Sequence, residues 1–138
     1  MDRNTWIGLI AAALCLAFVF LTQDTGGSAV ETLEKETMAI HDEAMKEMAD
    51  MNRIGRMLKQ ELVSLDSLAP RRAVIREVLT LMNQAEEGMY TWMQQYTPPG
   101  ELPAGEAEQF LTEQKRKIEK NYQDMLAASA AGKKLLSK

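Results

Sequence analysis

Methionine is the residue type whose number and spacing in this chain point to chemistry. The 138 residues include ten methionines and a single histidine. One group steps by three, four and three residues, which places its members on one flank of a helix: Met38, His41, Met45 and Met48. A second group lies further along the chain and consists of Met89, Trp92 and Met93. In antiparallel neighbouring helices the two groups would meet.

Thioether sulfur and imidazole nitrogen are ligands for a soft metal ion. Uncharged thioethers favour Cu(I), which imidazole also accepts. The candidate metal ligands are His41, Met45, Met48, Met89 and Met93. The other interpretation needs no cofactor, because methionine is a flexible core side chain that packs well against aromatic rings. We take core packing as the first interpretation and a Cu(I) site as the alternative.

Residue patterns typical of catalysis do not occur in this sequence. His41, Asp42 and Glu43 resemble the start of a zinc-protease helix, but Met45 stands where that motif needs its second histidine. Adjacent carboxylates such as Glu86 and Glu87 lie on a polar helix face and are expected to be solvated. We predict no catalytic residues, and we do not expect an enzyme.

Long helical segments must position these side chains. Prolines occur only at positions 70, 98, 99 and 103, where the hydrophobic periodicity stops. We therefore predict an all-α fold in which residues 29–138 form an antiparallel three-helix bundle. The expected helices span about 29–65, 69–96 and 104–136.

Each helix carries an apolar stripe that we expect to form the core. The first stripe is Val30, Leu33, Thr37, Ile40, Ala44, Met48, Met51, Ile54 or Gly55, Leu58, Leu62 and Leu65. The second is Val74, Ile75, Val78, Met82, Ala85, Met89, Met93 and Tyr96. The third is Ala107, Phe110, Leu111, Gln114, Ile118, Tyr122, Met125 and Ser129.

Local signals refine the first two helices. Ser28 and Glu31 have capping-box spacing, so the first helix is expected to begin at Ser28, after a Gly-rich linker over 22–28. Gly55 costs about 1 kcal/mol in mid-helix relative to alanine, and its place on the stripe indicates a close approach of two helices. Asp66 and Ser67 offer a turn and an N-cap for the second helix.

Residues 1–28 form an N-terminal anchor or signal segment plus linker. Residues 6–21 are an unbroken apolar run, close to the length that spans a bilayer and longer than most signal-peptide cores. Arg3 precedes the run, and no further basic residue occurs before Lys35. The positive-inside rule then predicts a single-pass inner-membrane protein with a cytoplasmic N-terminus and residues 23–138 in the periplasm.

Cleavage and lipidation are the alternatives to this signal-anchor. Residues 27–29 (GSA) have the small-residue pattern of a cleavage site, and cleavage would give a secreted chain. Cys15 is the only cysteine, but Leu14 precedes it and apolar residues follow it, unlike an acylated lipoprotein cysteine. We therefore favour an uncleaved anchor.

The charge pattern bears on the class of partner. The chain has 16 basic and 20 acidic residues, interspersed, with a net charge of −4. No basic block is present, so nucleic acid is not an expected partner. Coiled-coil-like spacing without catalytic groups instead predicts an interaction protein that binds a protein partner or itself.

Three segments resemble a known group of proteins: residues 38–45 (MAIHDEAM), 89–93 (MYTWM) and 110–118 (FLTEQKRKI). They look like small exported helical proteins of Bacteroidota that carry the label "viral A-type inclusion protein repeat". The resemblance covers Val30 to about Leu136. It implies an exported helical protein but no activity. Members of the group look like lipoproteins, and the apolar run beyond Cys15 departs from that pattern and favours an inner-membrane anchor.

Overall fold

The computed structural model describes the backbone of residues 3–137 and the side chains of residues 29–137. Three helices account for most of this part of the chain: α1 (Arg3–Ser64), α2 (Pro70–Gln95) and α3 (Ala104–Leu136). Residues 3–137 contain no strand. The predicted all-α fold is confirmed, and the ends of α2 and α3 lie within a residue of the predicted ones.

The expected start of the first helix at Ser28 is wrong. The backbone of α1 runs without a break from Arg3 to Ser64, so residues 22–28 are part of the helix and do not interrupt it. Two glycines in mid-helix cost about 1 kcal/mol each, but a break would require a new helix to be nucleated, which is also unfavourable. The helix therefore continues through Gly26 and Gly27, because helical residues precede and follow them.

Membrane insertion is predicted for a segment whose side chains are not described. Among the described residues, no helix is long and apolar enough to cross a membrane. The predicted segment, residues 6–21, lies outside the residues whose side chains are described.

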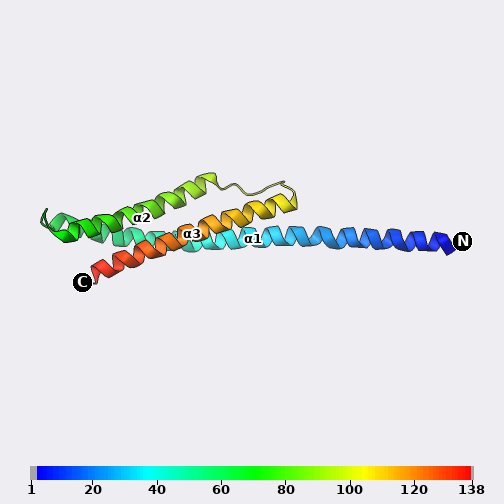
Figure 1. Ribbon diagram of the computed structural model, residues 1–138, viewed down its shortest axis with the longest axis horizontal. Coiled ribbons are helices and arrows are strands. Elements are labelled where there is room, and N and C mark those ends of the chain that lie inside the picture. Colours follow the sequence, from blue (N-terminus) through cyan, green and yellow to red (C-terminus); the bar gives the residue numbers. More distant parts are fainter. Residues whose placement is uncertain (1–2, 138) are drawn as a thin grey trace.

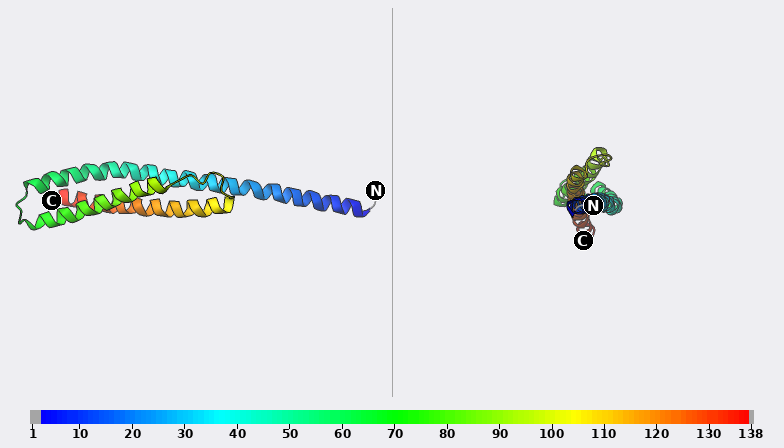
Figure 2. Two further views of the ribbon diagram at one scale, coloured as in Figure 1. Left: turned by 90° about the horizontal axis from the view of Figure 1, so that it is seen from above. Right: turned by 90° about the vertical axis from the view of Figure 1, so that its right-hand side faces the viewer.

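The helices run up, down and up. α1 and α3 point in the same direction and α2 runs between their ends in the opposite one (Figures 1 and 2). The turn between α1 and α2 lies at the same end of the bundle as the C-terminus of α3, and the N-terminal part of α1 extends beyond the opposite end (Figure 1). We call the end with the α1–α2 turn the distal end and the other the proximal end.

The predicted stripes form the core, with two adjustments on α2. Most of the stripe residues are buried, and most of the others are half-buried against the core. The prediction that Val74 is a core residue is wrong, because 44% of Val74 is exposed. Leu79 and Trp92 are buried instead. The buried face of α2 is therefore turned slightly from the predicted one.

Small side chains on α3 set the spacing of the helices. α3 buries Ala107, Ala128, Ser129 and Gly132, whereas α2 buries mostly large side chains. α1 and α3 accordingly have the most extensive contact, and α1 and α2 the least. A Cβ atom at Gly132 would lie 2.6 Å from Ile54 Cγ2 and 2.5 Å from Met82 Cε, so the close approach of helices requires a glycine here.

The close approach predicted at Gly55 is wrong. A Cβ atom at that position would lie 3.5 Å from Met82 Sδ and 3.8 Å from Leu79 Cδ2, which is ordinary contact. The neighbouring α2 helix stands far enough away to admit a methyl group.

Two arginines at the start of α2 connect it to the ends of α1 and α3 at the distal end. The Arg71 guanidinium forms an ion pair with Glu61 of α1 and donates a hydrogen bond of 2.7 Å to the Leu135 carbonyl of α3. Arg72 Nη1 donates to the carbonyls of Leu62 and Leu65 at 2.5 and 3.0 Å. The Leu62 and Leu135 carbonyls lie in the last turns of α1 and α3, where carbonyls lack partners within the helix, so the arginines take the place of C-terminal caps.

The α2 start differs in detail from the prediction. The turn occurs where Asp66 and Ser67 predicted it, and Asp66 Oδ1 accepts a hydrogen bond of 2.8 Å from the Leu68 amide. The residue that caps α2 is Ala69, however, and Pro70 is the first helical residue.

Two glycine substitutions should have opposite effects on stability. Gly132→Ala would force Ile54, whose branched side chain cannot move far, out of its position, and we expect it to destabilise the full chain by about 1–3 kcal/mol. Gly55→Ala should stabilise it by about 0.5–1 kcal/mol, because alanine is the better helix former and its methyl group has room. Urea unfolding followed by circular dichroism measures both, and destabilisation of the same size by both variants would contradict the packing described here.

The Glu61–Arg71 ion pair should make stability depend on pH. The hydrogen bond from Arg71 lowers the pKa of Glu61 below its ordinary 4.5. A carboxylate with a lowered pKa stabilises the fold above that ordinary value, and the contribution disappears as pH falls through the lowered one. The stability difference between the parent chain and Glu61→Gln should therefore be largest near neutral pH and shrink in acid. A difference that grew in acid would contradict the pairing.

Candidate functional site

His41 and Trp92, predicted to be neighbours, are in contact. The two rings stack with centroids 5.6 Å apart and an angle of 29° between their planes. His41 Nδ1 lies 3.1 Å from Asp42 Oδ1, and only 17% of the His41 side chain is exposed. The antiparallel arrangement of α1 and α2 thus brings together the two helical regions that carry the methionine groups.

The candidate methionine ligands belong to the core or border it. Met48 and Met89 are buried in the core cluster, and Met45 and Met93 are half-buried against it. Met38 lies at the surface. Within the described residues, no group of three or more histidine, cysteine or acidic side chains could hold a metal ion. A metal site in this region would therefore depend on thioether sulfur.

An aromatic column extends the His41–Trp92 stack toward the proximal end. Trp92 stacks on Tyr96 with ring centroids 4.7 Å apart, and Tyr96 lies 6.3 Å from the ring of Phe110. Because Tyr96 follows α2 and Phe110 belongs to α3, the column links the helices on either side of the loop 97–103. Burial raises the pKa of Tyr96, and the Glu34 carboxylate raises it further.

Polar atoms inside this column have no partners. Trp92 Nε1 and the Tyr96 hydroxyl are buried and make no hydrogen bond to any described residue. Such atoms cost about 1–3 kcal/mol each when they are left unpaired. The rings of the column therefore stack on one another, while Trp92 Nε1 and the Tyr96 hydroxyl are left without hydrogen bonds.

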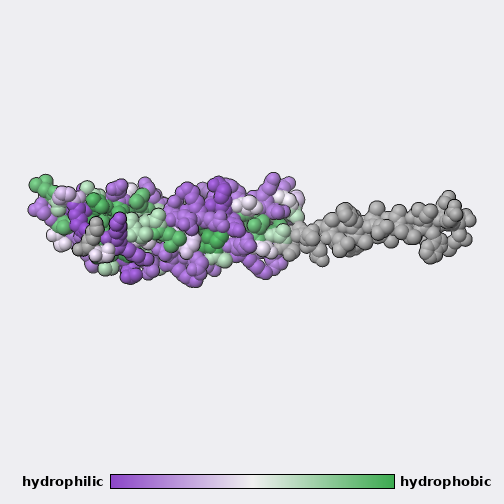
Figure 3. Space-filling model, turned by 60° about the horizontal axis from the view of Figure 1, so that its bottom comes forward, coloured by the Kyte–Doolittle hydropathy of each residue, from purple (hydrophilic) through white to green (hydrophobic). Residues whose placement is uncertain are grey.

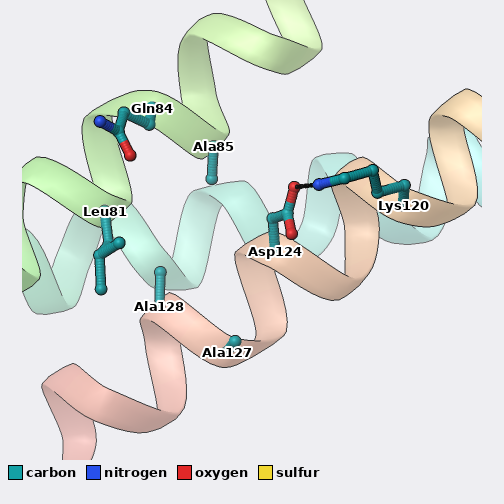
Figure 4. Close-up of a pocket in the computed structure, with 7 residues that line it drawn as sticks. All are labelled: Leu81, Gln84, Ala85, Lys120, Asp124, Ala127 and Ala128. Atoms are coloured by element: carbon teal, nitrogen blue, oxygen red, sulfur yellow. Dashed lines mark hydrogen bonds and ion pairs between the residues drawn. The ribbon is translucent and has the colours of Figure 1, made fainter.

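A groove runs between α2 and α3 on the surface of the bundle. It consists of two adjoining hollows of about 320 and 250 Å³ that share Lys120 and Asp124. Figure 4 shows the first hollow, where Leu81, Gln84 and Ala85 of α2 face α3. From α3 it is lined by Lys120, Asp124, Ala127 and Ala128. Small side chains therefore form much of its floor, and Leu81 is 46% exposed beside it.

Charged side chains form one rim of the groove. Lys120 Nζ pairs with Asp124 Oδ2 at 2.6 Å, as the dashed line in Figure 4 shows. Lys117 lines the second hollow. The α3 rim thus offers two lysines and one aspartate to anything that lies in the groove.

Asn121 makes a polar contact with α2 beside Gly88, in the second hollow. Asn121 is only 8% exposed, and its Nδ2 donates a hydrogen bond of 2.9 Å to the Ala85 carbonyl. A Cβ atom at Gly88 would lie 2.4 Å from this Nδ2, so the amide can reach α2 only beside a glycine. Asn121 Oδ1 is buried without a partner among the described residues.

One carboxylate of the Glu86–Glu87 pair on α2 has a structural role. Glu86 Oε1 accepts hydrogen bonds from Asn52 Nδ2 of α1 at 3.1 Å and from the Tyr90 hydroxyl at 3.4 Å. Glu87 is exposed. Glu86 thereby joins α1 to α2 through Asn52.

The sequence did not reveal the groove. Its lining residues alternate between polar and small types on two helices, and each set alone resembles an ordinary solvent face. Only the relative register of α2 and α3 brings them together. Gly88 and the pair Ala127–Ala128 were the available signal, since small residues at helical spacing mark a shallow surface.

Comparison with known proteins adds no relative to this description. Neither the protein-family models, nor the curated proteins, nor the solved structures compared with this chain include a match.

Proposed function

We propose that this protein is a membrane-anchored, non-enzymatic interaction protein that receives a helix of a partner protein in the α2–α3 groove. The observation that supports the proposal is the groove itself, with its small-residue floor and its half-exposed leucine. An α-helix is about 10 Å wide and packs closely against small side chains. Amphipathic helices commonly bind by laying an apolar face into such grooves.

The rim suggests what the partner helix carries beside its apolar face. Lys117 and Lys120 favour acidic residues at the edge of that helix, and Asp124 partly balances them. Charges at a rim guide association and orientation more than they add affinity. Leu81 then acts as the apolar anchor in the first hollow.

The anchor and the location are part of the same proposal. Residues 6–21 would hold the chain in the inner membrane, with the N-terminus in the cytoplasm and the bundle in the periplasm. A secreted or lipid-anchored chain after signal cleavage is the alternative. The resemblance to exported helical proteins of Bacteroidota supports the same side of the membrane.

A bulky residue on the groove should block partner capture. Ala127 is exposed and lines the groove, so Ala127→Arg should fill the groove without disturbing the core. Ala130→Arg, at another exposed α3 position that does not line the groove, is the matched control. With a photo-crosslinker at Leu81 of the full chain in its native membrane, we expect a discrete product that Ala127→Arg reduces at least tenfold and Ala130→Arg preserves.

The mass of that product separates the possible partners. A heterologous protein supports the proposal as stated, while a product of twice the chain mass assigns the groove to self-association. No product, or equal loss in both variants, would overturn the groove as a binding site.

A soft-metal site is the second candidate, and the His41 environment supports it. The Asp42 carboxylate beside Nδ1 would orient the ring and leave Nε2 for a metal, which is a usual arrangement for ligating histidines. Met45 lies one helical turn beyond His41, and Met93 follows the stacked Trp92. These residues would bind Cu(I) through thioether and imidazole ligands.

Competition with a Cu(I) chelator under reducing conditions tests this candidate. Binding by the parent chain should disappear in the double variant His41→Ala, Met45→Leu, with little change in helicity because methionine and leucine have similar volumes. Met57→Leu removes an exposed methionine elsewhere on α1 and should have no effect. No binding by the parent chain, or binding that survives the double variant, would exclude these ligands.

A further inference from the structure

Charge is divided unequally between the two ends of the bundle. At the distal end, residues 51–80 and 126–137 carry eight basic and three acidic side chains. At the proximal end, residues 27–50 and 81–125 carry six basic and fifteen acidic side chains. The nearly neutral composition of the chain therefore conceals a bundle with a basic distal end and an acidic proximal end.

Several basic side chains of the distal end are free to meet a ligand. Arg56, Lys59 and Arg76 are exposed and form no ion pair with any described residue, and the same holds for Lys133 and Lys134. Of the three acidic side chains at this end, Glu61 pairs with Arg71, while Asp66 and Glu77 are exposed and form no ion pair with any described residue. Five unpaired basic side chains against these two carboxylates leave the exposed charge of this end positive on balance.

The most exposed large apolar side chains lie at this same end. Val63 and Leu68 are 87% and 89% exposed, whereas the next, Tyr90, is 47% exposed. Both belong to the segment 63–68 that closes α1 and begins the turn. Figure 3 shows hydrophobic residues at the outer end of the bundle, at the left of the view. We call residues 63–68 the distal tip.

From these observations we infer that the distal tip docks on an anionic lipid bilayer. Leu68 and Val63 would enter the boundary between headgroups and acyl chains, and the surrounding arginines and lysines would contact lipid phosphates. Apolar side chains beside basic residues are the usual composition of such interfacial contacts. The contact would be weak by itself and would tighten when the protein is held nearby.

Lipid suits this surface better than an acidic protein does. Protein interfaces depend on a cluster of anchors that becomes fully buried in a complementary pocket. Val63 and Leu68 are only two exposed apolar side chains, which is too few for such a buried centre. A fluid bilayer needs no matching shape, and it offers apolar and anionic groups at adjacent depths.

The position of the tip has a consequence if residues 6–21 are an anchor, as proposed above. The N-terminus and the tip lie at opposite ends of the molecule (Figure 1). The part of α1 between the anchor and the tip would be about 65 Å long at 1.5 Å per residue. The bilayer that the tip meets would therefore be a second one, and the protein would bridge two membrane surfaces.

A vesicle-docking measurement tests the inference with the full chain. The chain is reconstituted into phosphatidylcholine vesicles and mixed with acceptor vesicles that contain either phosphatidylcholine alone or added phosphatidylglycerol. Energy transfer between labelled vesicles reports docking. We expect docking only to the phosphatidylglycerol acceptors, and we expect added salt to weaken it.

Variants at the two ends identify the surface. The pair Lys59→Gln, Arg76→Gln should weaken docking by roughly tenfold or more, and Val63→Ser with Leu68→Ser by roughly tenfold. The matched controls at the proximal end are Lys35→Gln with Lys46→Gln, and Leu102→Ser, which should leave docking unchanged.

The outcomes separate the tip from the anchor. If the chain does not remain in the donor vesicles, the anchor fails, and flotation of the full chain with phosphatidylglycerol vesicles tests the tip with the same variants. Docking that is equal for both lipids, or that tip and control variants reduce alike, would overturn the inference. No association with phosphatidylglycerol vesicles in either format would also overturn it and would leave an acidic protein as the ligand of the tip.

Discussion

The close contact between α1 and α3 is the constraint on which the rest of the structure depends. It is possible because α3 presents small side chains to α1, and at Gly132 no side chain at all. α2 buries larger side chains and stands further away, so Met82 and Leu79 fill the space that a closer helix would occupy. The shallow surface lies between α2 and α3, whose contact is intermediate, where Ala85, Ala127 and Ala128 line it. The groove is thus a consequence of where the glycines and alanines lie.

Much of this fold could be predicted from local sequence patterns, without knowing which helices contact each other. Prolines and the apolar periodicity located α2 and α3, and the stripe of α1 from Ala44 to Leu58 is buried as predicted. The continuity of α1 was missed, because Gly26 and Gly27 weaken a helix locally but do not outweigh the helix on both sides. Gly55 and Gly132 have the same local signature, and only the packing of α2 and α3 decides which of them is required.

The candidate site was predictable only in part, for the same reason. The antiparallel order of α1 and α2 was sufficient to bring His41 next to Trp92. The aromatic column beyond Trp92 depends on how the loop 97–103 returns the chain, which periodicity does not specify. The groove and the hydrogen bond from Asn121 to the Ala85 carbonyl depend on helix register, and the charge division becomes visible only when the ends of three helices are brought together.

Three features of the molecule then have distinct places along its length. The anchor proposed for residues 6–21 lies at one end, the groove lies along the middle of the bundle, and the distal tip with Leu68 lies at the other end. Such an arrangement suits a protein that holds partners in fixed positions relative to a membrane and carries out no reaction itself.

Hydrogen exchange of the full chain, compared between its native membrane and the purified state, tests the central claim most directly. If a partner helix occupies the groove, the amides of α2 over residues 81–92 and of α3 over residues 117–128 should exchange more slowly in the membrane, while those of α1 over residues 44–58 change little. Equal protection in both states, or slowing confined to α1, would contradict the assignment of the groove as the binding surface.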